Sequence, residues 1–130
     1  MRIITFGTFD ILHYGHIRIL ERAKAMGNTL IVGVSSDALN QKKKDRAPVY
    51  PEFERMEIIK SLRCVDEVFL EESLEKKRDY ILQHKADILV MGNDWEGKFD
   101  EFSNICKVHY LERTPSISTT SIIEVCKNNF

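Results

Sequence analysis

Short apolar segments alternate along this chain with segments of helical periodicity, and this alternation limits the possible folds more than any other feature. The apolar runs end at glycine or polar residues and are too short for helices, which is typical of buried strands. They lie at residues 2–6, 30–34, 65–70, 88–91 and 107–111. Strands that alternate with helices pack into a mostly parallel sheet covered on both faces. We therefore predict an α/β fold with a doubly wound sheet of five strands.

The first two helices are predicted from apolar spacing. One begins at about Gly15 and is ended by Gly27-Asn28, and a second begins near Pro51 and continues to about residue 62. The second helix has a four-residue apolar stripe: Phe53, Met56, Ile59 and Leu62. Between these helices, Ser35, Ser36 and Asp37 should cap a short helical turn, followed by a polar, basic loop over residues 41–46.

Two more helices are predicted in the second half of the chain. A charged helix over residues 74–84 is expected to bury three apolar side chains: Leu74, Ile81 and Leu82. The last helix should begin at Ser118 or Thr119 and run to about Lys127. Ser121 and Glu124 have the spacing of a capping box near its start.

The composition indicates one soluble domain over residues 1–130, with 43% hydrophobic and 30% charged residues. A formal charge of −1 argues against a general nucleic-acid binder. No signal-peptide pattern or run of ~20 apolar residues is present, so we expect a cytoplasmic protein with no nucleic-acid or membrane partner. The cysteines Cys64, Cys106 and Cys126 lack CxxC spacing and should be free thiols packed inside.

The unusual residues follow the ends of three predicted strands, at 7–16, 41–46 and 92–95. In open parallel sheets, ligands bind beyond the carboxyl ends of the strands. The first of these segments, GTFDILHYGH, is a glycine turn that leads into a helix N-terminus, where backbone N–H groups and the helix dipole favour an anion. His13 and His16 can both donate hydrogen bonds to phosphate there. We interpret this turn as a phosphate site.

Other interpretations of the histidine pair are weaker. The segment lacks the GxGxxG of dinucleotide sites and the Gly-Lys-Ser/Thr of a P-loop. His13 and His16 with Asp10 could bind zinc, but no cysteine or third histidine has supporting spacing. A histidine on an apolar face is often only a core residue, although a pair around Gly15 at a strand-to-helix turn fits that interpretation poorly.

GTFDILHYGH over residues 7–16 and RTPSISTT over residues 113–120 resemble the HxGH and RTxGISTT signatures of the cytidylyltransferase family. The match is closest to the short bacterial glycerol-3-phosphate cytidylyltransferases and extends over nearly the whole chain. It implies a Rossmann-like domain that transfers CMP from CTP to glycerol 3-phosphate, giving CDP-glycerol and pyrophosphate for a surface polymer such as teichoic acid or capsule. It also implies Mg²⁺ bound with CTP, and a homodimer.

The resemblance assigns roles position by position. The implied catalytic residues are His13, His16, Lys44 and Arg113. The implied nucleotide-binding residues are Thr8, Phe9, Asp10, His13, His16, Arg63, Asp94, Trp95, Arg113, Ser118 and Thr119. The implied acceptor-binding residues are Lys44, Arg46 and Arg55, and no side chain is implied as a metal ligand. The basic loop is slightly longer than the family pattern, so Lys43 is an alternative to Lys44.

Two departures from the family pattern bear on substrate choice. Asn93 stands where a second acidic residue is expected, and Pro115-Ser116 replaces x-Gly. Neither removes a charged phosphate ligand, so transfer chemistry should be retained. Three alternatives to this function remain. They are transfer to another phosphorylated alcohol, transfer of AMP, and a nucleotide-binding module without turnover.

Overall fold

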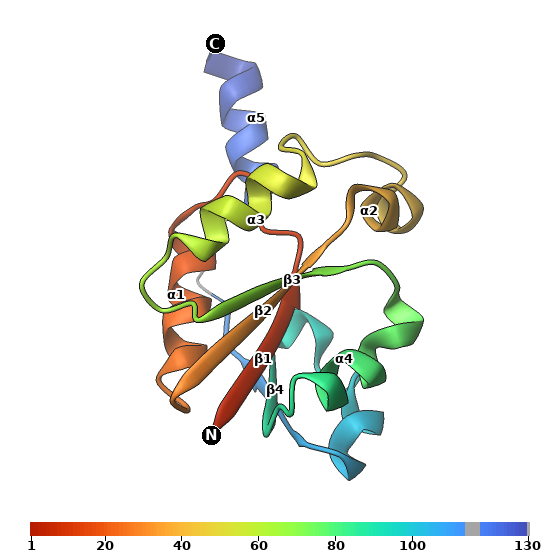
Figure 1. Ribbon diagram of the computed structural model, residues 1–130. Coiled ribbons are helices and arrows are strands. Elements are labelled where there is room, and N and C mark those ends of the chain that lie inside the picture. Colours follow the sequence, from red (N-terminus) through yellow and green to blue (C-terminus); the bar gives the residue numbers. More distant parts are fainter. Residues whose placement is uncertain (114–117, 130) are drawn as a thin grey trace.

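In the computed structural model, which describes residues 1–113 and 118–129, the apolar runs form one parallel sheet (Figure 1). Its strands are β1 (Arg2–Gly7), β2 (Thr29–Ser35), β3 (Glu67–Glu71), β4 (Ile88–Gly92) and β5 (Lys107–Leu111). Their order is β3-β2-β1-β4-β5, and every neighbouring pair is parallel. The order reverses at β1, so chain segments that leave β1 and β4 diverge and open a crevice at the carboxyl edge. The predicted fold class is confirmed.

The helices cover both faces of the sheet because successive residues of a strand point to opposite sides. Ile3 faces α1 (Tyr14–Lys24) and α3 (Glu52–Lys60), where it packs in a cluster with Leu20 and Ile59. Ile4 faces the other side and packs in a second cluster with Ile81 of α4 (Lys77–Gln83). Short 3₁₀ turns at Leu74–Lys76, Asn93–Trp95 and Asp100–Asn104 complete this second layer.

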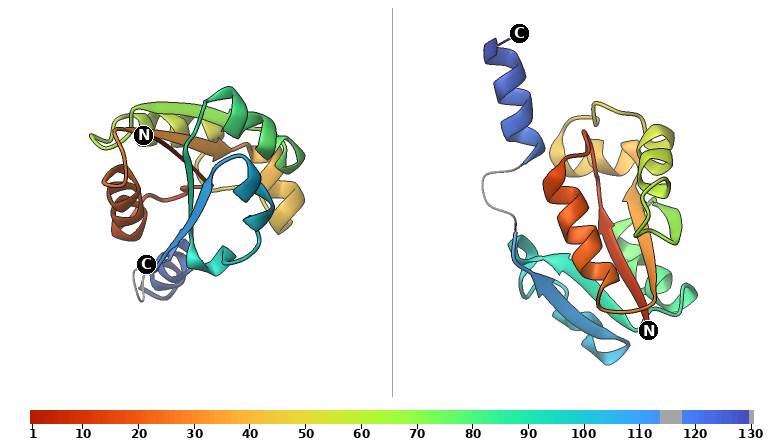
Figure 2. Two further views of the ribbon diagram at one scale, coloured as in Figure 1. Left: turned by 90° about the horizontal axis from the view of Figure 1, so that it is seen from below. Right: turned by 90° about the vertical axis from the view of Figure 1, so that its left-hand side faces the viewer.

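Two helices lie at the carboxyl edge of the sheet. The helix α2 (Asp37–Lys44) follows β2, and α5 (Thr119–Asn129) follows β5. Figures 1 and 2 show α5 extending away from the sheet and its covering helices, and none of its residues is buried. None of the helices in the described residues is both long and apolar enough to cross a bilayer.

Several local predictions are wrong. Lys42, Lys43 and Lys44 form the last turn of α2 rather than a loop, because Ser36 caps the helix and Asp45, in the left-handed region with φ of 57°, ends it. The helix predicted over 74–84 begins with a 3₁₀ turn. Four side chains expected inside the protein are exposed: Phe53, Leu74, Leu82 and Cys126.

The cap of the last helix also differs from the prediction. Ser118 precedes α5, its carbonyl accepts from Ile122 N–H, and its Oγ accepts from Ser121 N–H at 3.0 Å. In return, Ser118 N–H donates to Ser121 Oγ at 3.1 Å. The capping box is therefore Ser118 with Ser121, and the Ser121–Glu124 spacing lies one turn inside the helix.

Candidate active site

A cavity of about 750 Å³ opens at the carboxyl edge of the sheet. It lies between the segment that joins β1 to α1, the end of α2 with the loop that follows it, the end of β4, and the start of α5. Most of the residues implied by the resemblance line it: Thr8, Phe9, Asp10, His13, His16, Lys44, Arg46, Asp94, Trp95, Arg113, Ser118 and Thr119. Residues of the first signature segment and the described residues of the second, Arg113 and 118–120, therefore meet at one site.

The segment between β1 and α1 has an unusual backbone. Phe9 and Ile11 have φ of 53° and 49°, the left-handed region that non-glycine residues rarely adopt. The Phe9 ring is buried, lies edge-on to the His16 ring with centroids 5.5 Å apart, and lies directly against Gly7. A Cβ at Gly7 would come within 2.8 Å of this ring. Gly7 thus makes room for Phe9, which supports His16.

The two imidazoles are held as hydrogen-bond donors toward the cavity. His13 caps α1, with its Nδ1 accepting from Gly15 N–H at 3.1 Å, and His16 Nδ1 accepts from His13 N–H at 3.3 Å. The rings stack with centroids 3.8 Å apart. Because each Nδ1 is an acceptor, each neutral ring carries its proton on Nε2. The pair therefore presents two N–H donors from the first turn of a helix.

Burial keeps these histidines neutral in the free protein. The pKa of His16 is lowered to about 4, chiefly by burial and also by the neighbouring His13, while Asp10 opposes the shift. Burial and the Arg113 guanidinium lower the pKa of His13. The positive charge of the site at neutral pH therefore comes from lysine and arginine side chains.

Two adjacent lysines face different parts of the cavity. Lys44 Nζ lies 3.4 Å from Thr8 Oγ1, and burial lowers its pKa, with the nearby Lys43, Arg46 and Arg55 lowering it further and Asp10 opposing them. Burial also lowers the pKa of Lys43, but there the opposing carboxylate is Glu71. Both lysines line the cavity, Lys44 beside the β1 segment and Lys43 toward the end of β3.

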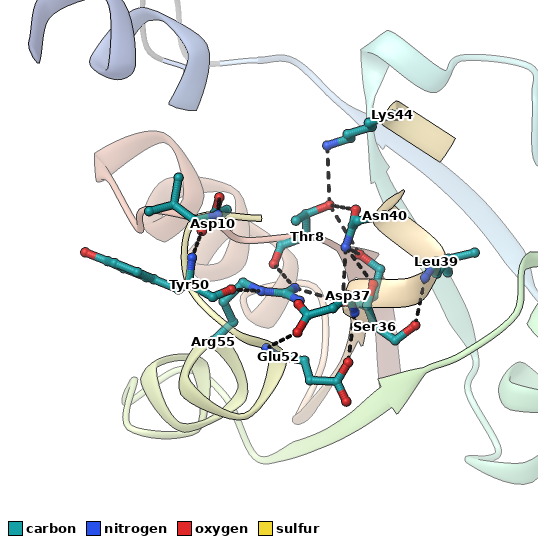
Figure 3. A network of polar contacts seen from close by, with 12 residues as sticks. Thr8, Asp10, Ser36, Asp37, Leu39, Asn40, Lys44, Tyr50, Glu52 and Arg55 are labelled. Carbon is teal, nitrogen blue, oxygen red and sulfur yellow. Dashed lines mark hydrogen bonds and ion pairs between the residues drawn. The ribbon is translucent and has the colours of Figure 1, made fainter. Parts of the chain in front are cut away.

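Arg55 does not lie where the resemblance implies. Its side chain is fully buried under the cavity wall, and its guanidinium donates to the carbonyls of Thr8, Ser35 and Tyr50 and pairs with Asp37 at 2.7 Å (Figure 3). Four protein acceptors take four of its five N–H donors, and the fully buried side chain does not line the cavity, so it does not face an acceptor molecule there. Arg63 is exposed in the turn after α3 and does not line the cavity either.

Asp10 lines the cavity, but both of its carboxylate oxygens bond to backbone. They accept from Val49 N–H at 2.7 Å and Tyr50 N–H at 2.9 Å, as Figure 3 shows for Tyr50. The carbonyl of Asp10 accepts from Thr119 Oγ1 at 2.8 Å. Asp10 thus ties together the β1 segment, the loop before α3 and the start of α5.

Lys77 and Glu71 are cavity residues that the sequence analysis missed. They form an ion pair of 2.7 Å with both side chains almost fully buried, and Lys77 Nζ lies 3.8 Å from the centroid of the Phe6 ring. Burial lowers the pKa of Lys77, and Glu71 opposes that shift. Glu71 ends β3, so the rule on the carboxyl ends of strands could have found it. Lys77 lies in a charged segment where no sequence pattern distinguishes it from the neighbouring charged residues.

The β4 side of the cavity carries Asp94 and Trp95. Arg113 Nη1 lies 3.3 Å from Asp94 Oδ2, and both of these side chains are exposed. Trp95 is 44% exposed, so Asp94 and Trp95 are both accessible to a ligand in the cavity. Asn93, the first departure from the family pattern, does not line the cavity. Pro115-Ser116, the second, lies outside the described residues.

The donor set fits a metal ion carried by a ligand rather than one held by the protein. In residues 1–113 and 118–129 no cluster of three histidine, cysteine or carboxylate side chains could hold a metal, so His13 and His16 have no third partner for zinc. Mg²⁺ usually keeps its waters and binds phosphate oxygens with few protein ligands. The cavity therefore suits a Mg²⁺ ion held by a polyphosphate.

Comparison with known proteins agrees with the geometry. The model of the family described as cytidylyltransferase-like matches residues 4–125. The chain belongs to this family. It is 49% identical over 124 residues to the glycerol-3-phosphate cytidylyltransferase of Bacillus subtilis (strain 168), covering 95% of each chain. It is 46% identical to the enzyme of the same name from Staphylococcus aureus (strain NCTC 8325 / PS 47), covering 93% of this chain and 91% of that one.

A solved structure has a similar fold. The lipopolysaccharide core biosynthesis protein from Thermoplasma volcanium GSS1 superposes with a TM-score of 0.75 at 29% identity, covering 88% of this chain and 98% of that one. The family model spans both signature segments, and the described residues of both segments line one cavity.

Proposed function

We propose that this protein is a glycerol-3-phosphate cytidylyltransferase that transfers CMP from CTP to glycerol 3-phosphate and releases pyrophosphate. The observation that carries the proposal is the cavity in which the two imidazole donors, five cationic side chains and the start of α5 converge. The cationic side chains are Lys43, Lys44, Arg46, Lys77 and Arg113. The relatives of that name match nearly the full length of the chain, which supports the choice of substrates.

The reaction requires positioning and charge stabilisation rather than a covalent intermediate. A phosphate oxygen of glycerol 3-phosphate attacks the α-phosphorus of CTP and forms a P–O bond, while the bond to the bridging oxygen breaks and its electron pair leaves with pyrophosphate. The attacking phosphate is already ionised at neutral pH, so no general base is required. The described site accordingly offers donors and cations around a cavity rather than a nucleophile–base pair.

Each group has a place in this scheme. The Nε2–H donors of His13 and His16 bind the α- and β-phosphate oxygens, where charge develops. Lys44 and Arg113 neutralise the triphosphate, and Ser118 and Thr119 present the amino end of α5 to the β- and γ-phosphates.

The acceptor occupies the other end of the cavity. Lys43 and Lys77 lie there beside Glu71, and the backbone-bonded Arg55 is not part of this end. On arrival of the acceptor, its phosphate would compete with Glu71 for Lys77, whose lowered pKa reflects incomplete compensation of burial.

Mg²⁺ is the proposed cofactor, bound with CTP by the oxygens of the triphosphate and by water. When bound, it would neutralise part of the charge of the leaving pyrophosphate. Asp94 is the exposed carboxylate in the cavity nearest to Arg113 and could bond to waters of the ion.

A substrate panel with pyrophosphate detection tests the function. Purified protein is incubated with Mg²⁺, with CTP, UTP or ATP, and with glycerol 3-phosphate, phosphocholine, phosphoethanolamine or a sugar phosphate. We expect release only with CTP and glycerol 3-phosphate. Faster release with another acceptor or with ATP would replace the proposed substrates, and binding of CTP without release would indicate a module without turnover.

Further proposals concern the cellular setting. We propose a homodimer in the cytoplasm that supplies CDP-glycerol for teichoic acid or another surface polymer. The family resemblance supports the dimer, and the described helices offer no membrane span. Light scattering tests the dimer directly, and a monomer at assay concentrations would contradict it.

A further inference from the structure

Three of the basic side chains of the cavity are carried by one segment, residues 37–52, which we name the basic strap. It comprises α2, the loop after it and the first residue of α3. Lys43, Lys44 and Arg46 project from it into the cavity. Like charges so close together repel one another, and this repulsion contributes to the lowered pKa of Lys44. Something must therefore hold the strap in place.

The two ends of the strap are joined by a reciprocal pair of hydrogen bonds, which we name the clasp. Asp37 N–H donates to Glu52 Oε1 at 2.8 Å, and Glu52 N–H donates to Asp37 Oδ2 at 3.2 Å. Asp37 is the first residue of α2 and Glu52 the first of α3. Each carboxylate thus satisfies an unpaired N–H of the other helix, at the positive end of its dipole.

Arg55 connects the clasp to the histidine segment. Its Nη2 donates to Asp37 Oδ1 at 2.7 Å, and its Nη1 donates to the carbonyls of Thr8 at 2.9 Å and Ser35 at 2.8 Å. Figure 3 shows the guanidinium between Thr8, Tyr50 and Asp37. The clasp therefore fixes the strap relative to the β1 segment that carries His13 and His16, and not only to its own two helices.

We propose that Asp37 and Glu52 are positioning residues whose clasp sets the affinity of the site for the triphosphate by holding the cations of the strap against the histidine pair. Neither carboxylate lines the cavity, so neither touches substrate. Opening the clasp lowers the fraction of protein in the binding-competent arrangement, and apparent affinity falls by that fraction. Bound CTP draws the strap back, so turnover at saturation should change little.

Three substitutions of Glu52 distinguish the effect of side-chain length from the effect of side-chain charge. Glu52→Ala removes the acceptor for Asp37 N–H. Glu52→Gln removes the charge but keeps an oxygen at the same reach. Glu52→Asp keeps the charge but is one methylene shorter. Glu52 is preferred to Asp37 as the site of change because loss of Asp37 would leave the buried Arg55 guanidinium without its counter-charge.

The experiment measures CTP binding by calorimetry and the KM and kcat of pyrophosphate release. We expect Ala and Asp at position 52 to weaken CTP binding and raise KM by about tenfold, the factor that corresponds to one charge-assisted hydrogen bond, with kcat within about threefold of wild type. The Gln variant should bind CTP within about twofold of wild type because its amide oxygen completes the clasp. Amide hydrogen exchange at residues 37 and 52 confirms that the clasp has opened.

Two results would overturn the proposal. One is unchanged CTP affinity in the Ala variant with faster exchange at residue 37, since the clasp would then serve stability alone. The other is normal binding by the Asp variant with impaired binding by the Gln variant, since charge rather than reach would then matter. The inference depends on the proposed function for its ligand. CTP binding is measured without acceptor. If the wild-type protein binds CTP but releases no pyrophosphate, the proposed function is contradicted, whereas the binding measurements on the variants still test the role of the clasp.

Discussion

In the proposed reaction, His16 is one of the two residues that donate a hydrogen bond to the phosphates where charge develops. Its Nε2–H donor is fixed by the bond from His13 N–H to Nδ1 and by the supporting Phe9 ring. We expect His16→Ala to lower kcat by about a hundredfold or more, the scale of losing one donor to a developing charge. His84→Ala is the control, because His84 stacks on Phe69 away from the cavity. Pyrophosphate release measures both, and near-normal turnover of the His16 variant would refute its role.

The pKa of His16 has a direction that can be tested. In the folded protein it lies at about 4, against 6.5 for an ordinary histidine. Between these values the unfolded chain binds more protons than the folded one, so this group should make stability fall as pH decreases from 6.5 to about 4. NMR titration of the imidazole should give the low midpoint, and added CTP should move it upward because phosphate charge favours the imidazolium. A midpoint near 6.5 in free protein would contradict the burial of His16.

A substitution of Gly7 tests whether the Phe9 ring holds His16 in position. In Gly7→Ala the new Cβ would meet the Phe9 ring at 2.8 Å, so the ring must move and His16 with it. We expect a loss of about 1–3 kcal/mol in unfolding free energy, as for other overpacked sites, together with a lower kcat. Gly92→Ala is the stability control, since its Cβ would lie 3.6 Å from Ile19 in ordinary contact. Urea unfolding compares the two, and equal midpoints would show that the Phe9 ring yields freely.

At the scale of elements, the cap of α5 links local structure to the site. Ser118→Ala removes the Oγ that accepts from Ser121 N–H, which should cost about 1 kcal/mol and fray the turn that carries Thr119. The expected results are faster amide exchange at the start of α5 and weaker CTP binding. Glu124→Ala is the matched control and should change neither, because Glu124 lies within the helix rather than at its cap. Equal effects of the two substitutions would contradict the assignment of Ser118 as the cap and would favour the predicted capping box of Ser121 and Glu124.

Elements with strong local signals were predicted well, and those that depend on tertiary contacts were not. The strands were found because both faces of a parallel sheet are buried, which leaves continuous apolar runs such as Ile88–Gly92. The lysines of α2 were assigned to a loop because polar residues carry no periodicity, although Ser36 caps a helix there. Phe53 shows the opposite error, since an apolar residue at helical spacing can still face outward.

The site was predicted through its motifs rather than its geometry. The histidine pair, Arg113 and the start of α5 reach the cavity because a parallel sheet gathers strand ends at one edge. The buried roles of Arg55 and Lys77 could not be predicted, because burial of a charge depends on partners distant in sequence, such as Ser35 for Arg55. A charged residue in a polar segment has the same appearance whether it is solvated or paired inside.

At the scale of the whole molecule, the cavity joins the two halves of the sheet. On one side lie the β1 segment and the basic strap, and on the other lie Asp94 at the end of β4 and Arg113 after β5. The net charge is only −1, so attraction for a polyphosphate is local to these cations rather than spread over the surface. A ligand that contacts both sides should therefore couple their unfolding.

That coupling predicts ligand-dependent stability. At a CTP concentration of about one hundred times its Kd, the unfolding free energy should rise by about 2.7 kcal/mol if only the folded state binds. The Glu52→Ala protein should need about tenfold more CTP for the same rise, because its clasp is open. Pyrophosphate lacks the nucleoside that we expect to contact Asp94 and Trp95 in the cavity, so it should stabilise the protein less at equal concentration. Thermal unfolding by calorimetry measures all three, and a transition temperature insensitive to CTP would show that the triphosphate does not bind across this cavity.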